Sequence, residues 1–498
     1  MAVGKVYLVG AGPGDPGLLT LKGQRCLEIA DLVLYDGLVN PSILRHSPAI
    51  AERTSRVSGP DGKKLNQTDI NARLVAAAKE GKTVVRLKGG DPYIFGRGTE
   101  EAEALKAAGV PFEVVPGVTA ATAAGEYAGI SVTHRRLSSA VAFVTGHEDP
   151  TKPQMLDYAS LAALPGTLVF YMGLGRIAAI TASLIKHGKS SATPVCVVSR
   201  ASRARQRSVS GSLADIAESV ASAGLAAPSL IIVGECAKQR DALQWFEQLP
   251  LFGKRIAVTR DVKQAEPVIR LIHELGGEAT VMPLIEVTPP SDWGKVDEAI
   301  DCIQNRDWIA FTSANGVRHF LNRLLERGLD MRRLSNVKLG VVGSATADVL
   351  AEFSLRADLI APQANAESLA DALKSHGADS VLWPCGNRAR KVLVERLTTE
   401  FITVWPIVVY ESSNATVDDR QLDGLKTDVD WVPLASPAMA RAFAELDIEA
   451  ARQPKIVTIS PLTSATAREC GLTVHAEAWN ANWPAMLQAI REHEAANG

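Results

Sequence analysis

The chain has 498 residues, a formal net charge of −2 and 46% hydrophobic residues. The length predicts roughly three to four domains of about 150 residues, and the near-neutral charge excludes an electrostatic case for nucleic-acid binding. No apolar run reaches the roughly 18 residues of a membrane helix, no signal-peptide pattern opens the sequence, and six scattered cysteines without a C-x-x-C pair argue against zinc and for a reducing compartment. We therefore expect a cytoplasmic protein without a metal or a membrane partner.

The first expected strand, VYLV, runs into the glycine-rich stretch GAGPGDPG and then a helical pattern. This order is typical of nucleotide-type sites, because glycines let the backbone approach a ligand without a Cβ in the way. The dinucleotide fingerprint is broken, since Asp15 replaces its third glycine, and Pro13 has no N–H for a phosphate. The loop predicts either a ligand with an adenosyl part and no pyrophosphate, or a structural turn.

Strands and helices alternate through the first half of the chain. Strands are expected at 5–9, 31–35, 83–88, 112–115, 141–145, 167–171, 195–198 and 229–233. Alternation of this kind predicts α/β layers. A break near Pro116 divides these strands into two groups.

Polar residues follow the second expected strand, where Asp36 ends an apolar run. Ligands of open α/β sheets gather at the carboxyl ends of strands, which makes Asp36 a candidate general base. The alternative is an aspartate that only starts a turn before Gly37.

The next polar segment is VVRLKGGDPYIFGRG, residues 84–98, with four glycines and four charged residues. Its glycine turn can press backbone against a flat ligand, and we expect Arg86, Lys88 and Arg97 to attract an anion. Small residues follow Pro116 in the segment GVTAA and leave space for an adenine or ribose. Further along, four arginines between 200 and 207 form either a solvated edge or a site for a polycarboxylate.

The pattern restarts near 247–253, and an internal repeat fills the second half. Residues 307–313 resemble 430–436, residues 342–347 resemble 459–464, and 255–288 resemble 380–412. Duplication predicts two similar lobes. Spacing leaves open whether each lobe forms from neighbouring copies or by crossing over.

Hydroxyl side chains stand where the repeated strands end and helices begin. They are Thr312, Ser313, Thr346, Ser436 and Thr463. Such hydroxyls are either helix N-caps or part of a ligand site, because exposed helix N-termini bind carboxylates.

Five motifs in order make residues 3–247 resemble uroporphyrinogen-III C-methyltransferases: GAGPGDPGLLTLKG, YDGLV, VRLKGGDPYIFGRG, PGVTAATAAGEYAGI and APSLIIVGE. The resemblance implies S-adenosylmethionine as methyl donor, two α/β domains with the site between them, and a homodimer. It also implies two successive methylations of uroporphyrinogen III to precorrin-2, with Asp36 as proton acceptor. The charge of Arg97 places it separately among the expected substrate contacts. The implied donor contacts are Pro13, Gly89, Gly90, Asp91, Ile94, Thr119, Ala120, Met172 and the backbone near Ala201.

One departure concerns the lysine that this family proposes as proton donor. Ser58 or Gly59 stands at its place here. Either Lys63 or Lys64 substitutes from a rearranged loop, or the lysine is dispensable, so no catalytic lysine is assigned.

The segments RIAVTR, FTSANGV, VVGSATA, IVVY and ASPAMA make residues 254–498 resemble uroporphyrinogen-III synthases. This resemblance implies closure of hydroxymethylbilane with inversion of ring D and loss of water, without a cofactor. It implies crossed lobes, one of about 254–288 with 413–498 and the other of about 290–410, and a role for Tyr410 in departure of the hydroxyl. Ser460 replaces a glycine that is common in this family.

The expected fold class is α/β: a two-domain tetrapyrrole methyltransferase fold at 1–247, with subdomains of about 1–115 and 116–247, a linker at 248–253, and a two-lobed α/β synthase with an internal repeat at 254–498. The expected function is a bifunctional enzyme of the siroheme and cobalamin branch. The alternative is a methyltransferase for another corrin intermediate, or a diphthine-synthase-like relative, with a ligand-sensing second half.

Overall fold

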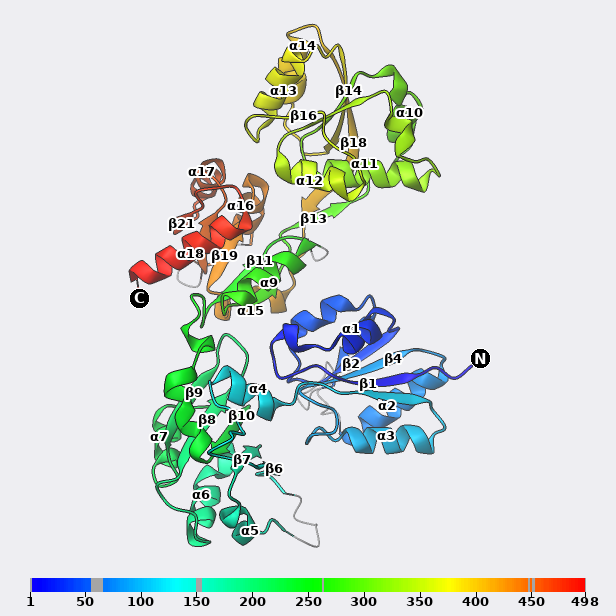
Figure 1. The fold of residues 1–498 in the computed structure, drawn as a ribbon. Helices are drawn as coiled ribbons and strands as arrows, with labels where there is room; N and C mark the ends of the chain where they lie inside the picture. Colours follow the sequence, from blue (N-terminus) through cyan, green and yellow to red (C-terminus); the bar gives the residue numbers. More distant parts are fainter. Residues whose placement is uncertain are drawn as a thin grey trace. The chain divides into compact units, whose positions relative to one another are not determined.

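The computed structural model describes residues 2–54, 66–148, 155–261, 264–446, 448–449 and 453–497. The chain forms two compact units, Met1–Met282 with Asp418–Gly498 and Pro283–Val417 (Figure 1). Their described residues build four sheets, three of five strands and one of six. The chain is thus an α/β protein, as the sequence predicts.

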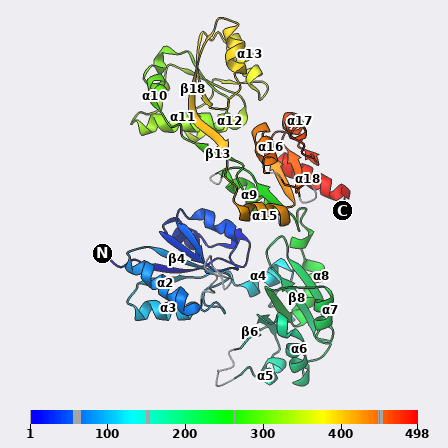
Figure 2. The same ribbon diagram turned by 180° about the vertical axis from the view of Figure 1, so that it is seen from behind.

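The first sheet is parallel and has the strand order β3-β2-β4-β1-β5. Its strands are β1 (Val6–Gly10), β2 (Leu32–Tyr35), β3 (Ile50–Arg53), β4 (Val84–Lys88) and β5 (Phe112–Val115). Helix α1 (Leu21–Glu28) covers one face, and α2 (Gln67–Lys79) and α3 (Gly98–Ala107) cover the other (Figures 1 and 2). Because both faces are covered, the central strands β1, β2 and β4 are almost fully buried. The parallel order brings the carboxyl ends of β1, β2 and β4 to one edge.

The second sheet has the order β6-β7-β10-β8-β9, with β6 and β7 parallel and the other pairs antiparallel. Its strands are β6 (Val141–Thr145), β7 (Thr167–Tyr171), β8 (Pro194–Ser199), β9 (Arg207–Ser212) and β10 (Ser229–Val233). Helix α4 (Ala120–Tyr127) packs on one face, and α5 (Tyr158–Ala163), α6 (Ile177–Lys186) and α7 (Ile216–Ser222) pack on the other.

The third sheet is parallel, in the order β12-β11-β19-β20-β21. Its strands are β11 (Arg255–Val258), β12 (Glu278–Val281), β19 (Trp431–Leu434), β20 (Lys455–Thr458) and β21 (Ala476–Glu477). The helices of this part are α9 (Glu266–Glu274), α15 (Asp419–Thr427), α16 (Pro437–Ala444), α17 (Pro461–Glu469) and α18 (Trp483–Asn497). Its core contains α9, α18 and the buried Trp431.

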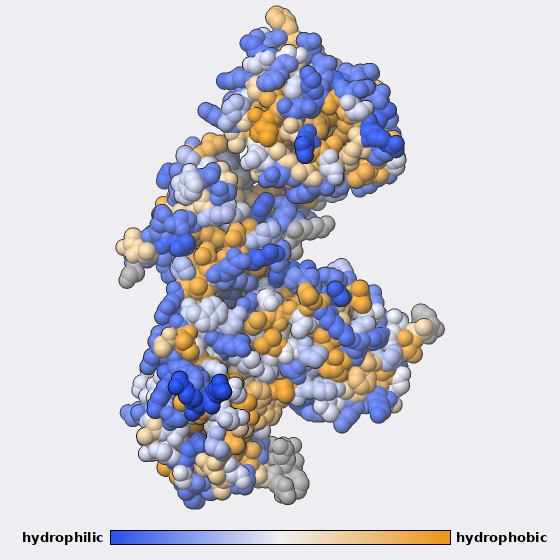
Figure 3. Space-filling model, viewed as in Figure 1, coloured by the Kyte–Doolittle hydropathy of each residue, from blue (hydrophilic) through white to orange (hydrophobic). Residues whose placement is uncertain are grey.

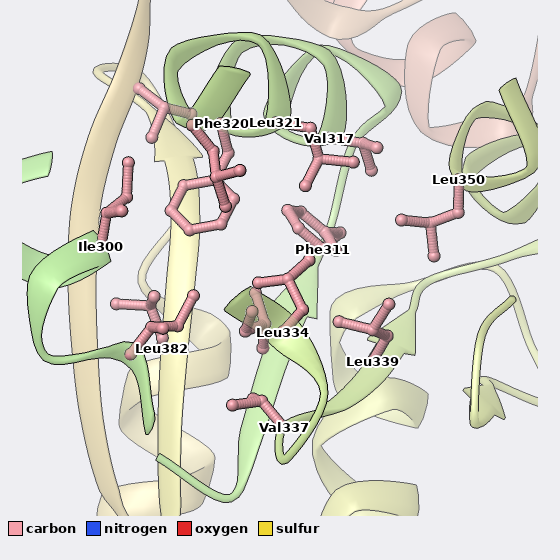
Figure 4. Close-up of a cluster of buried hydrophobic side chains, with 14 of the residues drawn as sticks. Ile300, Phe311, Val317, Phe320, Leu321, Leu334, Val337, Leu339, Leu350 and Leu382 are labelled. Atoms are coloured by element: carbon pink, nitrogen blue, oxygen red, sulfur yellow. The ribbon is translucent and has the colours of Figure 1, made fainter. Parts of the chain in front are cut away.

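The fourth sheet lies in the second unit and has the order β13-β18-β17-β14-β15-β16. Its strands are β13 (Ile285–Thr288), β14 (Trp308–Phe311), β15 (Lys338–Val341), β16 (Leu359–Ile360), β17 (Ser380–Gly386) and β18 (Thr403–Asn414). Its helices are α10 (Gly294–Asp301), α11 (Ala314–Glu326), α12 (Ser344–Glu352), α13 (Ala366–Ser375) and α14 (Val392–Thr398). Phe311 and Phe320 stand 6.0 Å apart between ring centroids within the core of this unit (Figure 4).

The strand orders combine the repeated segments crosswise. Strands from 255–281 share a sheet with strands from 431–477, whereas strands from 308–360 share a sheet with those from 380–414. Among the described residues, no helix is long and apolar enough to cross a membrane.

Candidate active site

Three glycine-bearing loops meet at the carboxyl edge of the first sheet. Gly90 N donates to Gly12 O at 2.8 Å, and Gly12 N donates back to Gly90 O at 3.2 Å. A Cβ on Gly117 would stand only 2.7 Å from the Cα of Gly10. The loops therefore touch through bare backbone, and a side chain at Gly117 would force them apart.

Asp36 joins this edge from the end of β2. Its Oδ2 accepts a hydrogen bond from Gly89 N at 3.0 Å, and its Oδ1 accepts one from Leu38 N at 3.0 Å. Two backbone donors thus orient the carboxylate directly beside the glycine turn. Asp91 has a similar linking role, since its Oδ2 accepts a hydrogen bond from Gly117 N at 3.1 Å.

The second sheet reaches the same loops through Tyr171 at the end of β7. The phenol oxygen lies 2.6 Å from Thr119 Oγ1 and accepts a hydrogen bond from Ala121 N at 2.9 Å. The ring of Phe95, from the loop after β4, stands 4.8 Å from the Tyr171 ring. Thr119 and Ala120 therefore lie where the two domains of the first half meet. Tyr171 is absent from the site residues expected from the sequence.

Backbone strain gathers in these loops. Non-glycine residues with a left-handed φ in the described parts of the chain are Phe95, Arg97, Met172, Arg200, Ser202, Ser354 and Phe401. Of these, Phe95 and Arg97 lie in the loop after β4, Met172 follows β7, and Arg200 and Ser202 flank Ala201 after β8. Each such conformation costs roughly 1–3 kcal/mol and persists only where its surroundings enforce it, which is common at ligand sites.

The expectation that Arg86 and Lys88 attract an anion is wrong. Both side chains are buried, and both bind the buried carboxylate of Glu101 at the start of α3, at 2.9 Å and 3.0 Å. Burial lowers the pKa of Lys88, and the nearby Arg86 lowers it further. The pair therefore anchors α3 beneath β4, because buried charges require partners.

Arg97, in contrast, is exposed at the mouth of the same loop. Its Nε and Nη2 donate to the two carboxylate oxygens of Glu100, each at 2.7 Å. The guanidinium is thus held in a fixed plane and keeps a donor for a ligand carboxylate.

Large apolar side chains are exposed on the loops that follow β2, β4 and β7. They are Leu38, Tyr93, Ile94, Phe95 and Met172, of which Leu38 is 56% and Met172 is 53% exposed. Figure 3 shows small apolar patches interspersed with polar residues on the viewed face. Apolar side chains at a loop edge of this kind suit the face of a large planar ligand.

Two further expected donor contacts are Pro13, in the glycine loop after β1, and Ala201, in the turn after β8. Pro13 is half-buried within the loop, and Ala201 is buried in the turn after β8. The next residue in that turn, Ser202, accepts a hydrogen bond from Asp15 N at 3.1 Å. Ser58, Gly59, Lys63 and Lys64 lie outside the described residues.

A second polar cluster lies in the unit Pro283–Val417. Tyr410, on β18, has its hydroxyl 3.2 Å from Ser313 Oγ, and Ser313 caps α11 by accepting a hydrogen bond from Gly316 N at 3.0 Å. Burial raises the pKa of Tyr410 and keeps the phenol protonated. Trp383 Nε1 donates to Thr312 Oγ1 at 2.9 Å. Tyr410, Ser313 and Thr312 are thus built into one region.

Of the other expected hydroxyls, one serine caps a helix and two threonines are buried. Ser436 caps α16 by accepting a hydrogen bond from Met439 N at 3.2 Å. Ser460 caps α17, and Thr463 lies buried behind it with its Oγ1 3.2 Å from Ser460 Oγ. Thr346 is buried within α12. Helix capping accounts for the two serines, and it leaves the helix N-termini as the groups that can face a ligand.

The fold and site define an α/β protein with three glycine-bearing loops at one sheet edge of its first half and a cluster of hydroxyl side chains around Tyr410 in its second. The family model of tetrapyrrole (corrin/porphyrin) methylases matches residues 5–217, and that of uroporphyrinogen-III synthase HemD matches residues 266–488. Among the described residues, no group of histidine, cysteine and acidic side chains could hold a metal ion.

Three known proteins illustrate the likeness. The porphyrin biosynthesis protein HemD of Ruminiclostridium josui is 38% identical over 72% of this chain and 71% of its own length. The S-adenosyl-L-methionine-dependent uroporphyrinogen III methyltransferase of Methanosarcina barkeri is 50% identical over 48% of this chain and 94% of its own. The crystal structure of the uroporphyrin III C-methyl transferase of Thermus thermophilus is 40% identical, covers 47% of this chain and 94% of its own, and has a TM-score of 0.41.

The chain therefore belongs to the tetrapyrrole methylases through its first half and to the uroporphyrinogen-III synthases through its second. It is an enzyme that carries a methyltransferase and a synthase of tetrapyrrole biosynthesis, as the two sequence resemblances predict.

Proposed function

We propose that the first half, residues 1–247, transfers two methyl groups from S-adenosylmethionine to uroporphyrinogen III and yields precorrin-2. The observation that carries this proposal is the Asp36 carboxylate, held by Gly89 N at 3.0 Å beside the glycine turn. A base in this place faces both the donor loop and the exposed apolar edge on which a macrocycle would lie.

The donor supplies an electrophilic methyl group on a cationic sulfur. The loops at Gly12, Gly90 and Gly117 hold it by backbone contact, and the apolar edge aligns the nucleophilic ring carbon with the methyl carbon. Alignment of this kind is worth about 7–11 kcal/mol of the barrier. Each new carbon–carbon bond leaves one proton in excess on the macrocycle, and Asp36 accepts it. Arg97 binds a propionate side chain at the mouth.

The second half, residues 254–498 after the linker 248–253, closes hydroxymethylbilane to uroporphyrinogen III with inversion of ring D. The terminal hydroxyl leaves as water when it receives a proton, and Tyr410 donates a hydrogen bond to that oxygen. Within the unit Pro283–Val417, the N-termini of α11 and α12 present backbone N–H groups to the substrate carboxylates. The two proposed lobes are 254–282 with 418–498, and 283–417, because β13 pairs with β18 in the second unit.

The two activities then form consecutive steps, because the product of the second half is the substrate of the first. We place the enzyme in the siroheme and cobalamin branch, in the cytoplasm, as a homodimer through the methyltransferase half. Sedimentation of the pure chain tests the dimer, which predicts twice the 53.0 kDa chain mass.

A coupled assay tests the proposed function. The full chain is mixed anaerobically with hydroxymethylbilane and S-adenosylmethionine labelled in the methyl group. We expect a tetrapyrrole with two labelled methyl groups, whereas unlabelled uroporphyrinogen III would contradict the methyltransferase half. Formation of uroporphyrinogen I, the uninverted product of spontaneous closure, would contradict the synthase half. Addition of uroporphyrinogen III in place of hydroxymethylbilane then tests methylation without the cyclisation step. A chain that leaves uroporphyrinogen III unmethylated would be a methyltransferase for another corrin intermediate.

A further inference from the structure

The segment from α9 to β12, residues 266–281, carries a carboxylate at the start of each element. Glu266 Oε2 lies 2.6 Å from Arg45 Nε, and Glu278 Oε1 accepts a hydrogen bond from Arg203 Nη2. Both arginines belong to the first half of the chain, and both glutamates belong to the second. All four residues lie within the same compact unit.

Each of these arginines lies on an element that holds the glycine loop after β1. Arg45 is in the helical turn Pro41–His46, which Asn40 caps, and Asn40 Nδ2 also donates to Gly14 O at 2.7 Å. Arg203 follows Ser202, whose hydroxyl accepts the hydrogen bond from Asp15 N. The two ion pairs therefore hold the two segments that hydrogen-bond to this glycine loop, one through Asn40 and the other through Ser202.

Packing at this place is close. A Cβ on Gly14 would stand 2.6 Å from Arg203 Cγ, so the arginine stem lies directly on the loop. The space left among the loop, Ser202, His273 and Glu278 is about 10 Å³, room for no more than about one water molecule. Burial lowers the pKa of His273, so its ring is neutral at pH 7 and leaves the charges to the ion pairs.

The ion pair between Glu278 and Arg203 is largely buried, and Arg203 is the nearest charged partner of the Glu278 carboxylate. The carboxylate is 8% exposed, and its Oε2 accepts no hydrogen bond from the described residues. Arg255 Nη2 approaches the same Oε1 only to 3.5 Å. Removal of Arg203 leaves Glu278 with the longer contact to Arg255, and removal of Glu278 leaves the largely buried Arg203 without this carboxylate. We therefore expect the turn at 200–206 to move when the pair is broken.

We infer that α9–β12 of the synthase half is a positioning element for the donor loop of the methyltransferase half. Glu266 and Glu278 fix Arg45 and Arg203, and through Asn40 and Ser202 they fix Gly14 and Asp15. Donor affinity in this enzyme thus depends on carboxylates that belong to the other catalytic half. The inference rests on the proposed function, because it takes this loop to hold S-adenosylmethionine.

Titration of the full chain with S-adenosylhomocysteine in a calorimeter tests the inference. We expect Arg203→Gln and Glu278→Gln each to raise the Kd about tenfold, and the double variant to raise it no more than either, because both changes break one link. Cyclisation of hydroxymethylbilane should stay unchanged in each variant. Glu494→Gln is the matched control, since Glu494 binds Lys254 and Lys455 within the second half, and its Kd should equal that of the wild type.

The outcomes separate the two proposals. A wild-type chain that binds no S-adenosylhomocysteine overturns both. Wild-type binding with an unchanged Kd in Arg203→Gln and Glu278→Gln overturns the positioning role alone. If Glu278→Gln does not fold, Glu266→Gln at the exposed end of the segment takes its place, with an expected threefold rise in Kd, and an unchanged Kd there overturns the inference equally.

Discussion

The phenol oxygen of Tyr171 and the hydroxyl oxygen of Thr119 lie 2.6 Å apart and join the end of β7 to the start of α4. Tyr171→Phe removes this hydrogen bond and leaves the buried N–H of Ala121 without its acceptor. An unsatisfied buried donor costs about 1–3 kcal/mol. We expect a lower unfolding temperature by calorimetry and a weaker Kd for S-adenosylhomocysteine. A variant with wild-type affinity would show that the donor does not depend on this junction.

Gly117 occupies the closest backbone contact of the site. In Gly117→Ala the new Cβ would stand 2.7 Å from the Cα of Gly10, so the loops must separate. Overpacking of this kind costs about 1–3 kcal/mol, and we expect loss of S-adenosylhomocysteine binding. Gly175→Ala is the control, because a Cβ there meets open space. Equal binding by the two variants would contradict the prediction.

Asp36→Asn keeps an acceptor for Gly89 N but removes the base. General acid–base groups contribute about a hundredfold to ten-thousandfold to rate, and we expect a loss of methyl transfer in that range. The measurement is label transfer to uroporphyrinogen III. S-adenosylhomocysteine affinity and cyclisation serve as internal controls and should not change. A methylation rate within twofold of wild type would assign the base elsewhere.

Tyr410→Phe preserves the ring that packs 5.7 Å from His319 and removes only the hydroxyl. The loss of one hydrogen bond to the departing oxygen, about 1.4 kcal/mol, predicts roughly tenfold slower cyclisation. Methylation of added uroporphyrinogen III should be unaffected. Wild-type cyclisation with the same product isomer would leave Tyr410 a structural residue.

The carboxyl group of Glu494 on α18 makes the stability of the folded state sensitive to acid. Burial raises the pKa of this carboxyl, but hydrogen bonds from Lys254, Lys455 and Trp431 outweigh it and lower the pKa from its ordinary 4.5 to about 2. The folded state therefore gains stability above pH 4.5 and loses it as the pH falls toward 2, by about 1–2 kcal/mol after allowance for solvent screening. Calorimetry at pH 7 and pH 3 should show a smaller difference for Glu494→Gln than for the wild type.

The eight strands expected in the first half are present within a residue or two, because runs such as Leu32–Tyr35 are buried on both faces. Strands β3 and β9 escaped prediction, since Ile50–Arg53 is a largely exposed edge strand beside β2 and Arg207–Ser212 is a polar edge strand beside β8. The glycine motifs likewise predicted the loops that meet at Gly12, Gly90 and Gly117.

Charge roles were harder to predict. Arg86 and Lys88 lie two residues apart on β4 and resemble ligand-binding residues. The carboxylate that neutralises them belongs to Glu101 on the next helix, and only the folded structure shows this contact. The contact between Asp15 and Ser202 spans 187 residues and has no local signal. Sequence spacing thus locates loops well, whereas it cannot tell which charged side chains form ion pairs inside the protein.

The antiparallel pairing of Ile285 with Asn414 places the two ends of the unit Pro283–Val417 next to each other. Opposed residues of such a pair are about 4.5–5.5 Å apart, so the chain enters and leaves this unit through adjacent backbone. The unit has the geometry of an insertion, which domains tolerate when their ends adjoin. It is consequently suited to excision as an independent domain, and a short bridge across the gap would rejoin the remainder.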